Sequence, residues 1–133
     1  MATFKLDIFT PYSHYLSTDV DFVSVWGEEY VYGILPNHTS MVSKVRISIL
    51  KVVIDGKENL YAIGGGVMYI DESHNMKLLL DSIESKSEID LNRALDAKLR
   101  AEARLNKKGD DIDIARAESS LKRALNRIHL NNL

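Results

Sequence analysis

The 133-residue chain carries a formal net charge of −2 and 45% hydrophobic residues, which suits one ordinary domain or a small domain with an appendage. No apolar run reaches the roughly 18 residues of a transmembrane helix and no segment resembles a signal peptide, so we expect a soluble protein without direct membrane insertion. The absence of cysteines fits a reducing compartment, and the mild acidity gives no electrostatic reason to expect nucleic acid as a partner.

The composition changes sharply along the chain. All ten aromatic residues and both prolines lie at or before Tyr69. Residues 1–84 carry six basic and eleven acidic side chains, whereas residues 85–133 carry eleven basic and eight acidic ones. Aromatic and β-branched residues favour strands, and Ala, Leu, Lys, Arg and Glu favour helices. We therefore predict an α+β protein with two domains, residues 1–84 and residues 85–133.

The first part has the two-residue period of half-buried strands. The alternating apolar runs are Phe4, Leu6 and Ile8; Val20 and Phe22 around Asp21; and Val45, Ile47 and Ile49. The turn signals between runs are Thr10-Pro11, Gly27, Pro36-Asn37 and the Asp55-Gly56 hairpin pair. Six to ten short strands without helical crossovers favour an antiparallel β-sandwich or flattened barrel.

After Ser85 the period becomes that of a helix. Ser87 and Asp90 resemble a capping box at its start. Two neighbouring stripes follow, Leu91, Leu95 and Leu99 beside Ala94, Ala97, Ala101 and Leu105. A stop at Lys107, Lys108 and Gly109, with a cap at Asp110 or Asp111, precedes a second stripe of Ile114, Ala117, Leu121, Ala124 and Ile128. The pattern predicts two helices of about 19 residues in an antiparallel hairpin with a seam of small residues.

The search for catalytic motifs is negative. No phosphate-binding loop with a lysine is present, and the triple glycine Gly64-Gly65-Gly66 indicates a bulge or a close backbone approach. The four histidines stand far apart without metal-ligand spacing, and no nucleophile motif occurs. The pattern I-D-x-x-R-A occurs twice, at 89–94 and 112–117. On physical grounds alone, an acid and an arginine in the first turns of a helix explain both copies.

Several short motifs cover the whole chain in order. They are Gly33-Ile34-Leu35-Pro36-Asn37-His38, the Gly65-Gly66 pair before a strand, Ile89-Asp90-x-x-Arg93-Ala94, and Arg116-Ala117-Glu118 with Lys122-Arg123-Ala124. Together they resemble the epsilon subunit of bacterial F-type ATP synthase. The most specific of them is the G-I-L-P-x-H signature, formed by Gly33, Ile34, Leu35, Pro36 and His38.

The resemblance implies a noncatalytic subunit of the central stalk, with no catalytic residue, no metal and no required cofactor. In such proteins the β-sandwich binds the gamma subunit and rests on the membrane-embedded c-ring, at the cytoplasmic face of the cell membrane. The helical hairpin folds against the sandwich, or opens into the catalytic head of alpha and beta subunits and restrains ATP hydrolysis. The residues matching its inhibitory contacts are Arg116, Lys122, Arg123 and Arg127. An ordinary solvated helix face is the alternative explanation of these charges.

The resemblance also implies that the closed hairpin binds ATP as a regulatory ligand. The matching positions are Glu84, Ile89, Asp90, Arg93, Ala94, Arg100, Arg123 and Arg127. Arginines seven apart on one helix and four apart on the other can bring four guanidinium groups near a triphosphate. Without a phosphate-activating lysine loop, the ATP would be sensed and not hydrolysed. The competing hypothesis is a stand-alone module that binds a small ligand in the β part, which requires a pocket of convergent polar groups.

Overall fold

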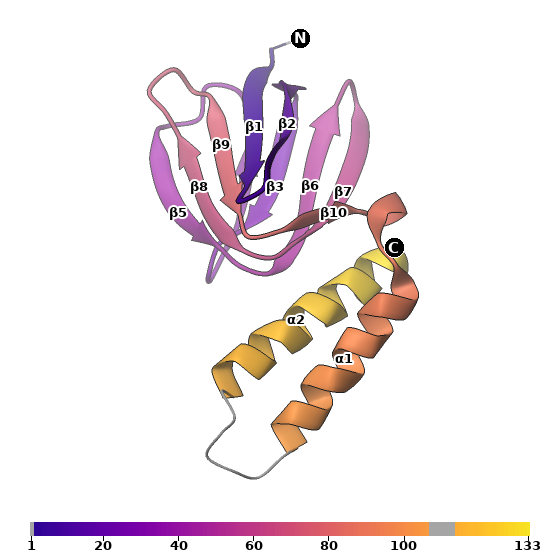
Figure 1. The fold of residues 1–133 in the computed structure, drawn as a ribbon. Helices are drawn as coiled ribbons and strands as arrows, with labels where there is room; N and C mark the ends of the chain where they lie inside the picture. The colour runs from indigo at the N-terminus through magenta and orange to yellow at the C-terminus, as the bar shows by residue number, and fades with distance from the viewer. Residues whose placement is uncertain (1, 107–113) are drawn as a thin grey trace.

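Within residues 2–106 and 114–133, which the computed structural model describes, ten strands form two five-stranded sheets and two helices follow them (Figure 1). The strands are β1 (Phe4–Thr10), β2 (Ser13–Val20), β3 (Phe22–Trp26), β4 (Val31–Ile34), β5 (Met41–Val45), β6 (Ser48–Ile54), β7 (Lys57–Ile63), β8 (Gly66–Ile70), β9 (Met76–Leu80) and β10 (Ile83–Ser85). A single 3-10 turn, η1 (Lys86–Glu88), leads to α1 (Leu91–Asn106) and α2 (Ile114–Asn131). The expected sandwich followed by a helical hairpin is confirmed.

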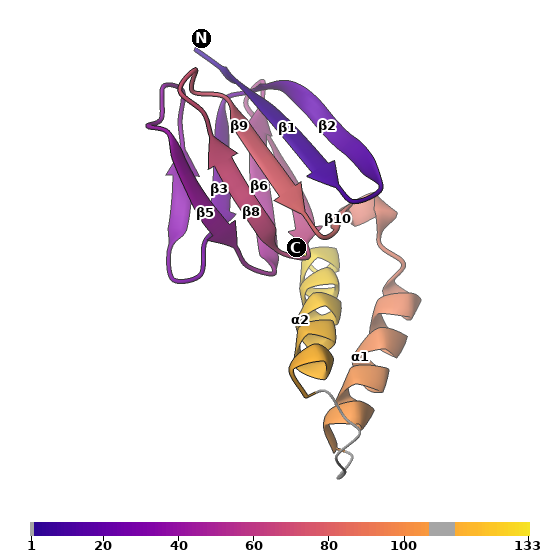
Figure 2. The same cartoon turned by 60° about the vertical axis from the view of Figure 1, so that its left-hand side comes forward.

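The two sheets face each other, and the helices lie at one end of the sandwich (Figure 2). The first sheet has the order β2-β1-β9-β8-β5 and the second the order β10-β7-β6-β3-β4. One pair departs from the expected antiparallel pattern, because β1 and β9 run parallel with Leu6 opposite Met76. The parallel pair arises because β1 inserts between its hairpin partner β2 and β9, which is itself paired with β8.

The hydrophobic core lies between the two sheets. Phe4, Leu6 and Ile8 are buried, as their alternation predicts. Leu50 and Val52 of the second sheet are fully buried in the same cluster. Every buried side chain of this cluster comes from residues 4–83, so the sandwich completes its core without the helices.

One predicted strand is wrong because the chain changes sheet in the middle of it. Val45 ends β5 in the first sheet and Ser48 begins β6 in the second, so the run from Val45 to Ile49 is not one strand. The connection shifts the inward-facing set by one position. Ser48 and Leu50 are buried, whereas Ile47 and Ile49 are half-buried and line a cavity beside α2.

A second change of sheet occurs at Asp21. Val20 ends β2 and Phe22 begins β3, so these two residues do not share a strand as predicted. The Asp21 carboxylate accepts a hydrogen bond from the Gly56 amide at 3.0 Å. Asp55 and Gly56 have φ angles of 50° and 77°, which suit a type I′ hairpin turn and confirm the predicted hairpin between β6 and β7.

The triple glycine marks a close backbone approach, as predicted. The Gly64 amide donates to the Ser82 carbonyl at 2.9 Å. A Cβ atom on Gly66 would overlap the Leu79 carbonyl oxygen, and one on Gly65 would lie 3.2 Å from the Val45 carbonyl oxygen. Side chains are therefore excluded where β8 begins between β5 and β9.

Gly66→Ala should lower the free energy of unfolding by about 2 kcal/mol, because the added methyl group displaces backbone of the neighbouring strand. Urea denaturation of the two proteins measures this difference. Gly56→Ala is the matched control, since its φ of 77° is also left-handed but no atom lies within 4 Å of the added Cβ. The control should lose only the strain of the left-handed backbone, about 1 kcal/mol. Equal losses in the two variants would contradict the proposed clash.

The helical part starts with two capping interactions that differ from the predicted box. The Ser85 amide donates to the Glu88 carboxylate at 2.9 Å across η1. Asp90 precedes α1, and its carboxylate accepts the Arg93 amide at 3.1 Å. Ser87 does not pair with Asp90 as predicted, because Ser87 lies inside η1 and its hydroxyl hydrogen-bonds the Ser85 hydroxyl at 3.1 Å.

The two helices pack side by side through small residues (Figures 1 and 2). The predicted seam is confirmed, since the buried residues on it are Ala94, Ala101, Ala117 and Ala124. The neighbouring leucines Leu91, Leu95 and Leu99 are exposed instead, Leu99 to 63%. Neither described helix is long and apolar enough to cross a bilayer. The predicted stop at Lys107, Lys108 and Gly109 and the cap at Asp110 or Asp111 lie outside the described residues.

Candidate functional site

A cavity of about 430 Å³ lies where the sandwich, both helices and the hinge, which is the segment 86–90 between β10 and α1, meet. It is lined by Glu84 of β10, by Glu88 and Asp90 of the hinge, by Arg93, Ala94, Ala97 and Arg100 of α1, and by Arg127 of α2. Its volume falls in the range usual for small-molecule sites. The lining thus joins residues from both predicted parts of the chain.

One wall of this cavity is an ion pair between the sandwich and α2. The Arg127 Nε atom donates to the Glu84 Oε1 atom at 2.5 Å, and each side chain is 29% exposed. β10 presents Glu84 at the sheet edge, where Glu84 pairs with Ala62 of β7. Partial burial makes a charge-assisted bond stronger than an exposed surface pair. The pair therefore helps to hold α2 against the sandwich.

A second wall of the cavity contains Glu88, which is held in place by a tyrosine distant from it in sequence. The Tyr15 hydroxyl donates to the Glu88 carboxylate, and the Tyr15 and Tyr61 rings meet edge to face with centroids 6.0 Å apart. The bond from Tyr15, followed by that from the Ser85 amide, holds the pKa of the Glu88 carboxyl below its usual range. Because that pKa is lowered, the contribution of Glu88 to stability is present at neutral pH and is lost as pH falls through it.

Two arginines of α1 are part of the cavity lining, and neither is paired with a carboxylate of residues 2–106 or 114–133. Arg93 and Arg100 both line it, and neither forms an ion pair with any residue in the described part of the chain. Asp90 accepts the Arg93 amide as a helix cap, and no ion pair joins the two side chains. The two guanidinium groups are therefore available to an anionic ligand.

The structure brings most of the predicted ATP residues together. Six of the eight line the cavity, namely Glu84, Asp90, Arg93, Ala94, Arg100 and Arg127. Arg123 lines an adjoining cavity of about 300 Å³, which shares Arg100 and Arg127 with the first. Ile89 lies in the linker before α1 and lines neither cavity. The second copy of the motif begins at Ile112 and Asp113, outside the described residues.

Five lining residues were not predicted to belong to a site. Glu88 lines the first cavity, Ala97 lines both, and Ala101, Arg104 and Ser120 line the second. Arg104 follows Arg100 by one helical turn, so the same spacing argument would have included it. Glu88 follows Ser85 by three residues, which is the spacing of a capping box. The contact between Glu88 and Tyr15 had no sequence signal, since 73 residues separate them.

The arrangement can bind an anion through its arginines. Three carboxylates in the lining repel phosphate, so they suit hydroxyl or amino donors of a ligand or orient the arginines. Across residues 2–106 and 114–133, no cluster of three or more His, Cys, Asp or Glu side chains has the geometry of a metal site. The lining suits a ligand with both an anionic end and hydrogen-bond donors.

The other predicted residues lie elsewhere. Gly33 and Ile34 are in β4, and the rest of the signature forms the turn before β5, where Asn37 has a φ of 66° and the His38 Nδ1 atom donates to the Thr39 carbonyl at 2.8 Å. Of the predicted inhibitory residues, Arg116 is exposed near the start of α2 and Lys122 lines a different cavity, toward the sandwich. The four cations therefore do not all line one cavity.

The order of the fold, sandwich first and helices second, matches models of one class of protein. Residues 3–86 match the beta-sandwich domain of the ATP synthase delta/epsilon chain, and residues 87–130 match its long alpha-helix domain. The fold and the site thus define a delta/epsilon-type chain of ATP synthase.

Two similar bacterial proteins make the assignment more specific. The ATP synthase epsilon chain of Bacillus licheniformis is 41% identical over 128 residues, covering 96% of this chain and 97% of the relative. That of Desulforamulus reducens is 42% identical over 126 residues, covering 95% of each. The chain belongs to the ATP synthase epsilon chain family, and it is a noncatalytic subunit. The alternative of a stand-alone ligand-binding module is set aside, because the similarity spans both domains.

Two solved structures share the fold. A chain of the Euglena gracilis mitochondrial ATP synthase structure of OSCP, F1 and c-ring superposes with a TM-score of 0.84 at 20% identity, covering all of this chain and 83% of that one. A chain of the Tetrahymena thermophila central stalk and c-ring structure superposes with a TM-score of 0.61 at 14% identity, covering 98% of this chain and 95% of that one.

Proposed function

We propose that the chain is a rotor subunit in the central stalk of a proton-translocating F-type ATP synthase, at the cytoplasmic face of the cell membrane. The sandwich binds the gamma subunit and the c-ring, and the hairpin restrains ATP hydrolysis when it opens toward the catalytic beta subunits. ATP bound in the closed hairpin counteracts that restraint. The observation that carries the regulatory part is the cavity that unites Glu84, Asp90, Arg93 and Arg100 with Arg127.

The division of labour rests on where the core lies. All buried members of the core cluster come from residues 4–83, and β10 ends at Ser85. Residues 1–84 therefore have the means to fold as a unit that holds the rotor, and residues 85–133 are free to move on the hinge. A chain that ends after Ser85 should still co-purify with the synthase.

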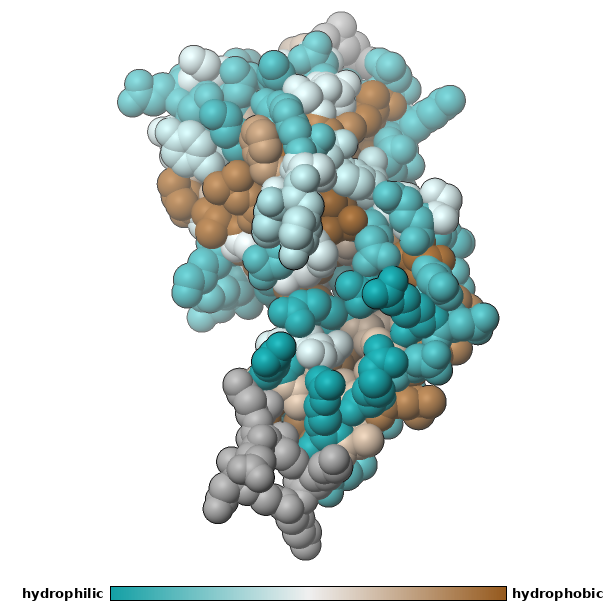
Figure 3. Space-filling view, viewed as in Figure 1, coloured by the Kyte–Doolittle hydropathy of each residue, from teal (hydrophilic) through white to brown (hydrophobic). Residues whose placement is uncertain are grey.

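The surface for gamma is the outer face of the first sheet. Its exposed apolar side chains are Val42, Val67, Tyr69 and Leu79. Strand pairing places Val42 opposite Tyr69 and Val67 opposite Leu79, so the four form one patch across β5, β8 and β9. Hydrophobic side chains gather over the β5 and β8 side of the sandwich in the space-filling view (Figure 3). A patch of this kind, rimmed by Lys44 and Lys77, suits a protein partner.

ATP acts in this proposal through the closed state. A ligand that touches the hinge and both helices binds only when they are packed together, so it stabilises closure by its differential affinity. Arg93 and Arg100 supply charge to the phosphates, and the carboxylates receive donors of the base or ribose. Plentiful ATP therefore keeps the inhibitory helices out of the catalytic head.

Calorimetry should detect saturable ATP binding by the isolated full chain, and Arg93→Ala should weaken it about tenfold or more, the usual cost of a charged hydrogen bond. Lys98→Ala is the matched control, because Lys98 lies on α1 outside the cavity and pairs with Glu102 at 3.7 Å. The control should bind ATP like the wild type. No saturable heat at millimolar ATP, or equal affinity in the Arg93 variant, would refute the ATP proposal.

A further inference from the structure

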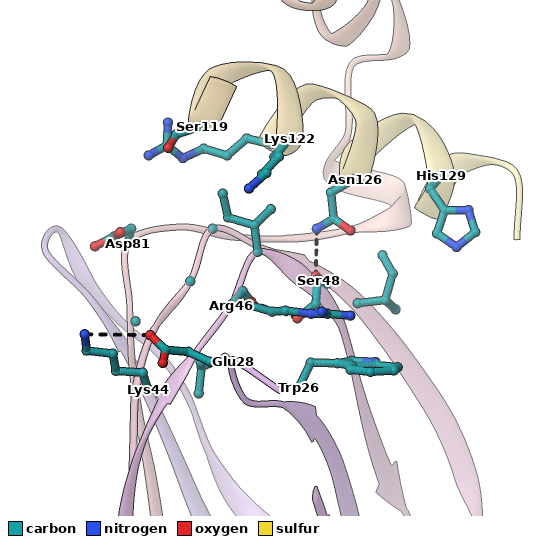
Figure 4. A pocket seen from close by; sticks show the side chains of 17 residues that line it. Trp26, Glu28, Lys44, Arg46, Ser48, Asp81, Ser119, Lys122, Asn126 and His129 are labelled. Carbon is teal, nitrogen blue, oxygen red and sulfur yellow. Dashed lines mark hydrogen bonds and ion pairs between the residues drawn. The ribbon is translucent and has the colours of Figure 1, made fainter. Parts of the chain in front are cut away.

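A second, larger cavity of about 1060 Å³ separates α2 from the end of the sandwich (Figure 4). The helix contributes Ser119, Lys122, Asn126 and His129, which recur every three or four residues and so share the face turned to the sandwich. Arg123 completes this wall, whereas Arg93 and Arg100 line only the cavities between the helices. The two ligand-sized cavities thus use different faces of α2.

The sandwich wall of this second cavity holds an oriented arginine. The Arg46 guanidinium lies 4.3 Å from the centre of the Trp26 ring, and both line the cavity (Figure 4). Stacking on tryptophan fixes a guanidinium group while leaving its N–H donors free at the edge. Lys44 is also in the lining, where its Nζ atom lies 3.7 Å from a Glu28 carboxylate oxygen.

The charges in the lining do not balance. Its cations are Lys44, Arg46, Lys122 and Arg123, and its carboxylates are Glu28 and Asp81. No ion pair joins Arg46, Lys122 or Arg123 to any residue in the two described segments. Cations from the sandwich therefore share one cavity with cations from α2, an arrangement that disfavours closure unless an anion enters.

A neutral contact holds the two walls in place. The Asn126 amide donates to the Ser48 carbonyl at 2.7 Å and to the Ile63 carbonyl at 3.3 Å. The helix is thus fixed to the start of β6 and the end of β7 without neutralising any lysine or arginine. The contact holds α2 beside the sandwich, so that both contribute side chains to one cavity.

We propose that this second cavity binds a phosphate-bearing anion, held by Arg46 of the sandwich and by Lys122 and Arg123 of α2. Arginine forks and a lysine ammonium suit phosphate oxygens, and the backbone of Gly64, Gly65 and Gly66 lines the same cavity. The anion bridges the sandwich and α2, so it favours the closed arrangement on which the proposed function rests, and Arg123 is the one residue that it shares with the predicted ATP set. Its phosphate comes either from a soluble compound or from an anionic lipid headgroup.

The only tryptophan of the chain lies in this cavity and supplies a direct readout. Titration of the full chain with inorganic pyrophosphate, at constant ionic strength, should change Trp26 fluorescence with a saturable curve. Arg46→Gln and Lys122→Gln should each weaken pyrophosphate about tenfold, whereas Arg93→Ala should not. Lys51→Gln, which loses the same charge on β6 beside Glu58, is the matched control and should bind like the wild type.

A parallel titration uses vesicles of phosphatidylglycerol, with phosphatidylcholine vesicles as the blank. A response to phosphatidylglycerol that exceeds the response to pyrophosphate and depends on Arg46 assigns the phosphate to a lipid headgroup. The reverse order assigns it to a soluble anion. A curve that sodium chloride reproduces, or affinities unchanged in the Arg46 and Lys122 variants, overturns the site. Loss of ATP binding in Arg93→Ala with pyrophosphate binding intact separates this site from the ATP cavity.

Discussion

Replacing Arg116 and Lys122 together with glutamine should raise ATP hydrolysis by the assembled synthase about fivefold. In our proposal these side chains of α2 meet carboxylates of the beta subunits when the hairpin opens. An exposed ion pair contributes up to about 1 kcal/mol, and 1.4 kcal/mol corresponds to a tenfold change, so two pairs account for the size of the effect. The increase should shrink at high salt, because screening already weakens such pairs in the wild type.

The choice of these two positions separates inhibition from control by ATP, and Arg46→Gln alone measures how much the proposed anion site, which includes Lys122, contributes to the change. Neither side chain lines the cavity that holds the predicted ATP residues, whereas Arg127 does and Arg123 lines its neighbour. Arg93→Ala should change hydrolysis in the opposite direction at millimolar ATP, since losing the ligand favours the open, inhibitory hairpin. Lys98→Gln controls for the loss of one positive charge from the helices. If hydrolysis is unchanged in the double variant, these cations have no inhibitory role and belong to an ordinary solvated helix face.

The fold could be predicted from the sequence wherever one face of an element meets the core. The alternation of Phe4, Leu6 and Ile8 and the Ala94 to Ala101 spacing both appear in the structure as buried residues. Sheet membership could not be predicted, because a two-residue period is the same in either sheet. The change of sheet at Arg46 and Ile47 therefore escaped detection, as did the parallel pairing of β1 with β9.

The arginines of the candidate site could be predicted from the sequence, but the contacts that form the walls of its cavity could not. Helical spacing places Arg93 and Arg100 on one face, and both line the cavity. The contacts that build the walls join distant segments, such as Glu84 with Arg127 and Tyr15 with Glu88. Such pairs depend on how the hairpin packs on the sandwich, for which the sequence has no local signal. The stacking of Arg46 on Trp26 is likewise a contact between separate segments that has no local sequence signal.

Val42→Glu combined with Leu79→Glu should abolish stable association with the gamma subunit. The two side chains are 65% and 51% exposed, so the free chain loses little stability, within about 0.5 kcal/mol for each surface change. In a complex, the same positions would bury two carboxylates in an apolar contact without partners. Truncating one central apolar contact of an interface costs about 2 kcal/mol or more, and buried unpaired charges add to that cost. We expect affinity for gamma to fall about a hundredfold or more.

Co-purification of the tagged variant with the synthase, and titration of the purified chain with purified gamma, measure this loss. Tyr12→Glu is the matched control, because Tyr12 is 94% exposed in the β1–β2 turn, away from the patch on β5, β8 and β9. It adds a carboxylate to the sandwich and should leave association unchanged. Equal unfolding curves for the three proteins keep a binding defect distinct from a folding defect. If the double variant still binds gamma like the wild type, the rotor contact lies on another face of the sandwich, and the apolar patch needs a different partner.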